Sequence, residues 1–273
     1  GVRPSLLHKA IPILASMFMF RLIVYLYELR YEKKPVSAWM RIAYFFLLPN
    51  VAFTLFPVVD FAAFKRTYFD RPDFEIYQRG ARLIFRGVTH LLAYRFVYYY
   101  WTPITDHIVG IRGVLFFTTS AWILFLHVSG IFHIAIGILC LFGFNLPDAN
   151  RLYFLAASPN EIWRRANIYW KDFMLKVFYL PAYKALQKRK LSMQSSLIIA
   201  TIFVFATTCM LHSYQWFWLV NRFPLNWSDA FFWTVFALLV LVNTLREVRS
   251  GKKRRPATSG WSANAATVHV VKI

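Results

Sequence analysis

Long apolar stretches alternate along the chain with short segments that carry charged residues, Trp or Tyr. A helix that crosses a bilayer needs roughly 20 apolar residues, and the sequence offers repeated windows of about that length. We expect spanning helices over Leu6–Leu29, Met40–Val59, Leu83–Trp101, Gly113–Phe144, Ser195–Val220 and Ser228–Leu245.

The window that begins at Gly113 is the longest of these. No Asp, Glu, Lys or Arg occurs between Gly113 and Leu146. At about 1.5 Å per residue, this run exceeds the length of one straight crossing. We therefore expect a tilted helix with a break near Gly130.

Composition supports the same class of protein. Hydrophobic residues make up 58% of the 273 positions and charged residues only 16%, which is more apolar than a water-soluble domain requires. The sequence therefore predicts an all-α, polytopic transmembrane protein. We expect residues 1–250 to form the transmembrane domain and residues 251–273, which are basic and rich in small polar residues, to form a disordered tail.

The formal net charge of +20 raises the question of nucleic-acid binding, because clustered Lys and Arg bind phosphate. The basic residues fall instead between the apolar windows, where the positive-inside rule and anionic lipid headgroups account for them. Basic clusters precede the fifth expected span at Lys188–Lys190 and follow the sixth at Arg246–Arg255. We expect both ends to face the cytoplasm, with membrane lipid and not nucleic acid as a partner.

The segment from Ser158 to Leu186 shows a different pattern, that of an amphipathic helix. Ser158, Pro159 and Glu161 have the order of a capping box with Pro at the first helical position. Such a helix lies along a membrane or lines a funnel. Its apolar face contains Ile162, Trp163, Ala166, Tyr169, Trp170, Phe173, Met174, Val177 and Phe178.

Asn167 interrupts this apolar face, one turn from both Trp163 and Trp170. A carboxamide in such surroundings needs a hydrogen-bond partner. The partner is either a neighbouring helix or headgroup, or a ligand in a functional site.

His212 is the main candidate for chemistry. It lies in an apolar span with no Asp or Glu within a helical turn, and ionisable groups inside membranes are costly and mark function by default. A neutral imidazole accepts a proton near physiological pH. The alternative is a structural His bonded to a carbonyl or hydroxyl of another span. Cys209 lies one turn away, but a thiol in apolar surroundings is inert by default.

No metal site is expected. His127 and His133 are six residues apart and so point to different faces of one helix. Neither an HExxH motif nor a paired CxxC motif occurs in the sequence.

Three stretches, in order and at compatible spacing, resemble the membrane-bound O-acyltransferase family, particularly its bacterial branch that acylates polysaccharides and teichoic acids. The first is Ser129–Gly137 (SGIFHIAIG) followed by Leu141–Pro147 (LFGFNLP). The second is Ser158–Ile168 (SPNEIWRRANI), which is similar to the family's SPSEFWRRWHIS. The third is Leu211–His212, which is similar to the family's LWHG.

The resemblance implies a membrane-embedded O-acyltransferase that moves an acyl group from a thioester donor to a hydroxyl acceptor, such as a glycan or lipid. It implies that His212 is the general base and that Asn167 orients the acceptor or polarises the carbonyl. The donor would be acyl-coenzyme A or an acyl carrier protein, with no bound cofactor, in the bacterial inner (cytoplasmic) membrane. Substrate or tunnel lining is implied for Trp163, Arg164, Arg165, Trp170, His133 and Ser213.

The chain also departs from the family pattern. His133 stands where the family usually has Asp, Ala166 where it has Trp, and Ser213 where it has Gly. Many bacterial members have His at the position of Asn167, whereas lipid-acylating eukaryotic members have Asn. These departures leave open an inactive, scaffold-like member of the family.

A non-catalytic transporter or channel subunit is the other alternative, although the internal repeat typical of transporters is absent from this sequence. The chain begins at Gly1, and family members usually carry further helices upstream. We therefore expect it to be part of a longer protein.

Overall fold

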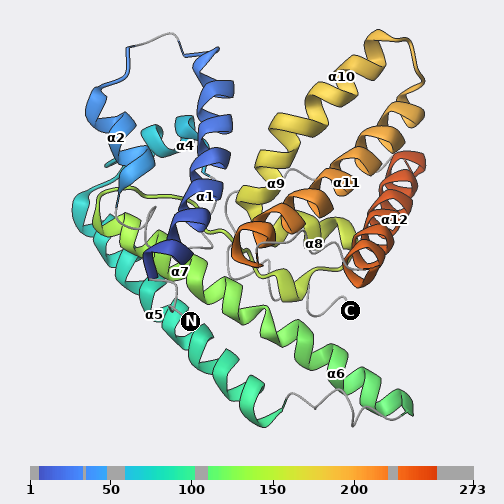
Figure 1. The fold of residues 1–273 in the computed structure, drawn as a ribbon, viewed down its shortest axis with the longest axis horizontal. Coiled ribbons are helices and arrows are strands. Elements are labelled where there is room, and N and C mark those ends of the chain that lie inside the picture. Colours follow the sequence, from blue (N-terminus) through green and yellow to red (C-terminus); the bar gives the residue numbers. More distant parts are fainter. Residues whose placement is uncertain (1–5, 33–34, 48–58, 102–109, 221–226, 251–273) are drawn as a thin grey trace.

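The computed structural model describes residues 6–32, 35–47, 59–101, 110–220 and 227–250 (Figure 1). Within these ranges the chain is all-α, and the only β-type pairing is an isolated bridge between Tyr68 and Phe144. The proposed tail, residues 251–273, lies outside the described residues. The α-helices are α1 (Leu6–Leu29), α2 (Ala38–Phe46), α4 (Phe61–Arg66), α5 (Asp73–Tyr100), α6 (Gly110–Leu124), α7 (Leu126–Leu141), α8 (Pro159–Arg165), α9 (Ile168–Met174), α10 (Leu180–Lys188), α11 (Met193–Val220) and α12 (Trp227–Arg249).

Three helical segments of the described chain are long and apolar enough to cross a membrane. They are Gly110–Leu141, which comprises α6 and α7, Met193–Tyr214 in α11, and Asp229–Arg249 in α12. The prediction of an all-α polytopic membrane protein is therefore confirmed. The last segment is only 11% buried inside the protein, as expected for a helix that presents most of its surface to lipid.

Of the first three expected helices, one has the predicted bounds and two do not. α1 has the bounds that the apolar pattern predicts. The expected span Met40–Val59 is wrong as a single helix, because α2 ends at Phe46 and its C-cap Leu47 has an extended conformation; residues 48–58 lie outside the described residues. α5 begins at Asp73, ten positions before the expected start at Leu83, because Asp73 and Glu75 supply favourable negative charge to its first turn.

The long apolar run breaks at Phe125, not near Gly130 as predicted. Phe125 separates α6 from α7, and its N–H donates to the carbonyl of Trp122 at 3.2 Å, a contact three residues back along the chain. Gly130 lies inside α7 and has another purpose. A Cβ at Gly130 would lie 2.9 Å from the Gly87 carbonyl oxygen of α5, so the absent side chain permits close helix packing.

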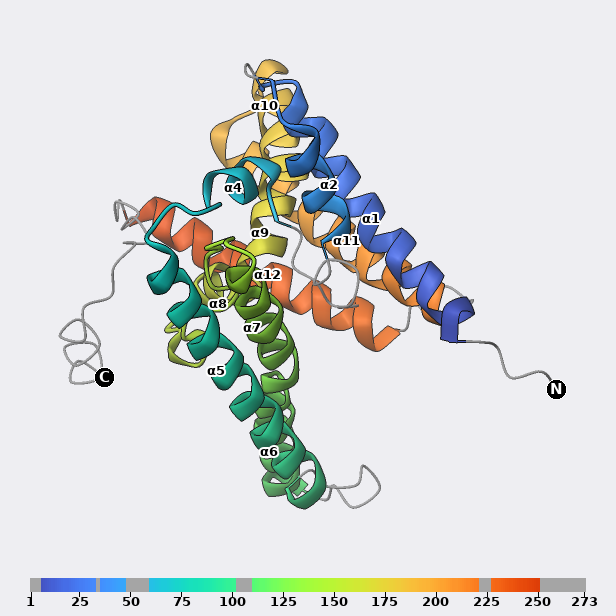
Figure 2. The same ribbon diagram turned by 90° about the vertical axis from the view of Figure 1, so that its left-hand side faces the viewer.

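Two pairs of facing glycines bring α5 and α7 together as antiparallel neighbours (Figure 2). Gly87 faces Gly130, and seven residues along each helix Gly80 faces Gly137. A Cβ at Gly80 would meet the Gly137 carbonyl oxygen at 2.8 Å. Small residues at such contacts let two helix backbones approach closely, which favours association inside a membrane.

The amphipathic segment is helical, but the expected single helix is wrong. Ser158 caps α8 as predicted, since its Oγ accepts from the Glu161 N–H at 3.2 Å, while the Glu161 carboxylate accepts from the Ala157 N–H at 3.0 Å. α8 then ends at Arg165, and Asn167 adopts a left-handed conformation with φ of 43°. α9 is followed by a π-helical turn, Leu175–Tyr179, and by α10.

The main core lies where α1, α2, α4, α7 and α9 meet. Aromatic rings fill it: Phe20 of α1 contacts both Trp170 and Phe173 of α9, with centroids 5.7 and 5.6 Å apart. An ionic contact supports the same junction, because Lys176 Nζ lies 2.5 Å from Glu28 Oε1 and 2.5 Å from Asp60 Oδ2. The first helix thus holds α9 and the π-helical turn in position.

Candidate functional site

His212 lies on α11, in the second half of that helix, with aromatic rings on two sides. Its imidazole contacts the indole of Trp170 from α9, with centroids 5.7 Å apart and an angle of 68° between the planes. It also contacts the indole of Trp233 from α12, with centroids 5.0 Å apart. His212 itself is exposed, so its ring is not sealed among packed side chains. Three separate helices therefore build this site.

Trp170 brings an unusual polar group to the site. Its indole Nε1 is buried and has no hydrogen-bond partner within the described residues. Buried donors in proteins are almost always paired, so an exception calls for an explanation such as a ligand acceptor. This unpaired donor belongs to the residue whose ring contacts His212.

Asn167 serves the backbone. Its Oδ1 accepts from the Trp170 N–H at 3.2 Å and caps α9, and its own N–H donates to Asn150 Oδ1 at 2.8 Å. Asn is one of the few non-glycine residues that tolerate a left-handed conformation. These hydrogen bonds hold the start of α9, the helix that carries Trp170.

His133 lies at a different interface from His212. It is 4% exposed between α5 and α7, and its Nδ1 lies 2.6 Å from the carbonyl oxygen of Ser129. The Ser129 hydroxyl lies 3.2 Å from Nδ1 of His90, and the two histidine rings are 5.1 Å apart. His90 thus reaches this interface from the middle of α5.

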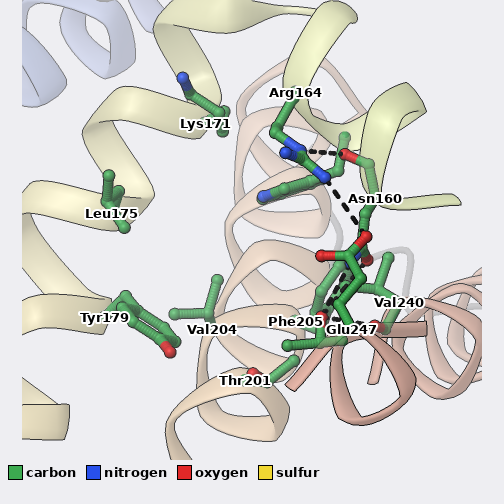
Figure 3. A pocket seen from close by; sticks show the side chains of 12 residues that line it. Asn160, Arg164, Lys171, Leu175, Tyr179, Thr201, Val204, Phe205, Val240 and Glu247 are labelled. Atoms are coloured by element: carbon green, nitrogen blue, oxygen red, sulfur yellow. Dashed lines mark hydrogen bonds and ion pairs between the residues drawn. The ribbon is translucent and has the colours of Figure 1, made fainter. Parts of the chain in front are cut away.

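A cavity of about 280 Å³ opens between α8, α9, the π-helical turn, α11 and α12 (Figure 3). Trp163 and Arg164, both expected at a substrate site, line it, whereas His212, Asn167 and Trp170 do not. Its full lining is Asn160, Trp163, Arg164, Lys171, Leu175, Tyr179, Thr201, Val204, Phe205, Val240, Thr244 and Glu247.

The remaining two expected site residues lie outside the cavity lining. Arg165 pairs with Glu161 of its own helix, with 3.2 Å between Nη2 and Oε2. Ser213 is 4% exposed within α11. Among the described residues, no group of three or more His, Cys, Asp and Glu side chains is placed to hold a metal ion.

An aromatic path connects the cavity with His212. The ring of Trp163 lies 4.8 Å from that of Phe205 on the cavity wall, and Phe205 contacts Trp233 at 6.4 Å between centroids. Phe205 and His212 are seven residues apart on α11, or about 10 Å along the helix axis. The cavity and His212 are therefore neighbouring parts of one helical unit.

Sequence reasoning missed Trp233, Thr244 and Glu247 of α12. A signal was available, since Val240, Thr244 and Glu247 follow the spacing of one helical face. Polar residues on one face of an otherwise apolar helix mark a face turned toward protein. No protein-family model and no curated protein matches this chain.

Proposed function

We propose that this protein is a membrane-embedded acyltransferase of the membrane-bound O-acyltransferase type, located in the bacterial inner membrane. His212 is its general base. The observation that carries the proposal is the contact between Trp170 and His212, at 5.7 Å between ring centroids. This contact joins the helix that follows the SPNEIWRRANI stretch to the Leu211–His212 stretch, two segments that resemblance alone had linked.

The proposed reaction transfers an acyl group from a thioester to a hydroxyl. The neutral imidazole of His212 takes the hydroxyl proton as the oxygen attacks the thioester carbonyl carbon. The carbon–sulfur bond then breaks, and the departing thiolate receives the proton. General-base assistance of this kind contributes about 10² to 10⁴ in rate.

The buried N–H of Trp170 gives this mechanism a second group. A hydrogen bond from Nε1 to the carbonyl oxygen strengthens as negative charge develops there, which lowers the barrier. Asn167 acts indirectly, because it caps the helix that presents Trp170. The acyl donor is a coenzyme A or carrier-protein thioester, and the acceptor is a glycan or lipid hydroxyl.

The test is acyl transfer by purified protein reconstituted in liposomes, with labelled thioester donors and mass spectrometry of the acceptor. His212→Gln lowers the rate by about 10² or more. His127→Gln is the matched control, because His127 stacks on Tyr94 of α5 and does not contact Trp170 or His212 in the proposed site. We expect this variant to retain normal acyl transfer. Wild-type rates in His212→Gln would refute the assignment.

The inactive alternative also has an observation in its favour. The Asn167 Oδ1 already accepts a backbone N–H, which leaves less capacity for a substrate. A protein that binds thioester donors but never turns them over, in the wild type as in His212→Gln, identifies a non-catalytic scaffold.

A further inference from the structure

His212 has no acidic neighbour within a turn of its own helix, but α12 brings one beside it. We propose that Asp229 of α12 is a positioning residue for His212, and that its carboxylate stabilises the imidazolium that forms when His212 takes a proton. This inference rests on the proposed function, because it assigns a partner to the proposed general base. It goes beyond that function in naming a residue outside all three stretches that carry the family resemblance.

One face of α12 is turned toward α11 and the cavity. Trp233 contacts His212 at 5.0 Å between ring centroids, and Phe236 contacts Phe205 at 5.6 Å. Val240 continues the same face and lines the cavity. These residues of α12 follow one another at intervals of three and four positions, which is the spacing of a single helical face.

Asp229 extends this face by one turn, because it stands four residues before Trp233. The two helices are antiparallel: Phe205 meets Phe236, whereas His212, seven residues later, meets Trp233. The step from Trp233 back to Asp229 is therefore about 6 Å along the axis of α12, and it follows α11 just past His212. Asp229 thus lies at the edge of the His212 site.

The charge of Asp229 acts on two side chains of α11. Electrostatic interactions join its carboxylate to His212 and to Cys209, which are three residues apart and so share a face of α11. Asp229 is itself exposed, so water screens part of its charge. It is also the acidic residue in the first turn of α12, where a negative charge stabilises the helix. The experiment has to separate this structural role from an effect on His212.

The proposed reaction makes His212 a cation for part of its course. The acceptor hydroxyl gives its proton to the imidazole as its oxygen bonds to the thioester carbonyl carbon. The carbon–sulfur bond then breaks, its electron pair goes to sulfur, and the proton passes from His212 to the thiolate. Asp229 remains ionised throughout. A nearby negative charge lowers the energy of the imidazolium and so of the transition state that leads to it.

Acyl transfer by the reconstituted full chain is measured from about pH 5 to pH 9. Asp229→Asn removes the charge with little change in shape. We expect its plateau rate to fall about tenfold, and the acid limb of its pH profile to move to lower pH by about one unit. Asp229→Glu retains the charge and most of the rate.

Asp73→Asn is the matched control. Asp73 is exposed and is an acidic residue in the first turn of α5, so this variant also removes a first-turn charge from a long helix. We expect it to leave both the rate of transfer and its pH profile unchanged.

A second measurement does not require turnover. Diethyl pyrocarbonate modifies the neutral imidazole, and mass spectrometry quantifies the modification of His212, which is exposed. The pH of half-maximal modification falls by about one unit in Asp229→Asn and stays at the wild-type value in Asp229→Glu and Asp73→Asn. Salt at about 1 M reduces the difference, because the Debye length falls to about 3 Å.

The two measurements separate this inference from the proposed function. Equal modification profiles of His212 in the wild type and Asp229→Asn would overturn the inference, even where His212→Gln abolishes transfer. A wild type without transfer would refute the proposed function, whereas a shifted modification profile would still establish the action of Asp229 on His212. A purely structural role predicts slower transfer in Asp229→Asn with an unshifted profile, and that result also overturns the inference.

Discussion

The indole of Trp170 meets the imidazole of His212 edge to face, at 68° between the ring planes. Trp170 also contacts Phe20 and Phe173, so its ring cannot turn without disturbing the core. The indole of Trp170, which limits the space around His212, is therefore held in place by Phe20 of α1. This rigidity gives the proposed mechanism its most specific test.

Trp170→Phe retains an aromatic ring but removes the buried N–H. Loss of one donor to a developing oxyanion costs about 10² to 10³ in kcat, with little change in KM because the donor acts mainly on the transition state. Steady-state acyl transfer measures both constants. A rise in KM at constant kcat would show that the indole only shapes the binding surface.

Asn167 offers a test that separates a helix cap from a catalytic group. Asn167→Ala loses the cap and places at φ of 43° a residue that tolerates the left-handed conformation less well than Asn, so we expect a loss of about 1–3 kcal/mol in stability. Asn167→Gly relieves the backbone and costs less than Asn167→Ala. Thermal unfolding in detergent measures the stability of the wild type and the two variants and so tests this ranking.

Activity of the same variants then identifies the role of Asn167. Asn167→Asp retains a capping oxygen. If the role of Asn167 is purely structural, Asn167→Asp transfers acyl groups at close to the wild-type rate, and Asn167→Gly retains part of that rate. Severe loss of transfer in a well-folded Asn167→Asp would instead assign the carboxamide to the substrate.

Lys176→Met removes the cation between Glu28 and Asp60. Their side chains are only 11% and 24% exposed, so two carboxylates remain close together without a cation between them. We expect a loss of about 1–3 kcal/mol near neutral pH, less than for a fully buried pair. Lys184→Met, on the exposed part of α10, is the control and unfolds as the wild type does.

The cost of Lys176→Met also depends on pH. Burial raises the pKa of Asp60 above 3.8, although the hydrogen bond from Lys176 opposes the shift. The folded state therefore binds the Asp60 proton more tightly than the unfolded state. As pH rises from 3.8 through the raised pKa of Asp60, ionisation of this carboxyl destabilises the fold. Without Lys176 the pKa rises further, so acidification toward pH 4 narrows the difference in melting temperature between wild type and variant.

Alkaline pH also narrows the difference in melting temperature between the wild type and Lys176→Met, for another reason. Burial lowers the pKa of Lys176, but hydrogen bonds to Asp60 and Glu28 outweigh burial and raise it above 10.5. The ammonium thus stabilises the fold below that value and ceases to do so as pH rises through the raised pKa. A constant difference between pH 4 and pH 11 would contradict both arguments.

Gly87→Ala tests the contact between α5 and α7. The added Cβ would lie 2.7 Å from the Gly130 carbonyl oxygen and 2.6 Å from Ile134 Cγ1, and backbone atoms cannot move aside cheaply. Overpacking of this kind costs about 1–3 kcal/mol. Val88→Ala, at the neighbouring exposed position, is the control. Equal melting temperatures for the two variants would mean that the helices separate freely.

The sequence predicted those features that depend on neighbouring residues. α1, the start of α8 at Ser158 and the spanning helices near the C-terminus follow from apolar runs and a capping box, which are local signals. Asn167 was noticed as a polar interruption, but its left-handed backbone depends on bonds to Asn150 and to the next helix. Periodicity alone extends a helix through that position.

Contacts between distant segments could not be predicted in the same way. Lys176 contacts Glu28, which is 148 positions away in the chain. The contacts of His90 with Ser129 and His133 depend on the glycines that bring α5 against α7. Such pairings depend on tertiary packing, which a single sequence without relatives does not reveal.

The two glycine pairs give α5 and α7 a mechanical property. Ile134 of α7 packs against Gly87, and Ile84 of α5 packs against Gly137, in one antiparallel register. Sliding either helix by a turn would therefore drive bulky side chains into the opposite backbone. The pair of helices α5 and α7 therefore moves as one rigid unit.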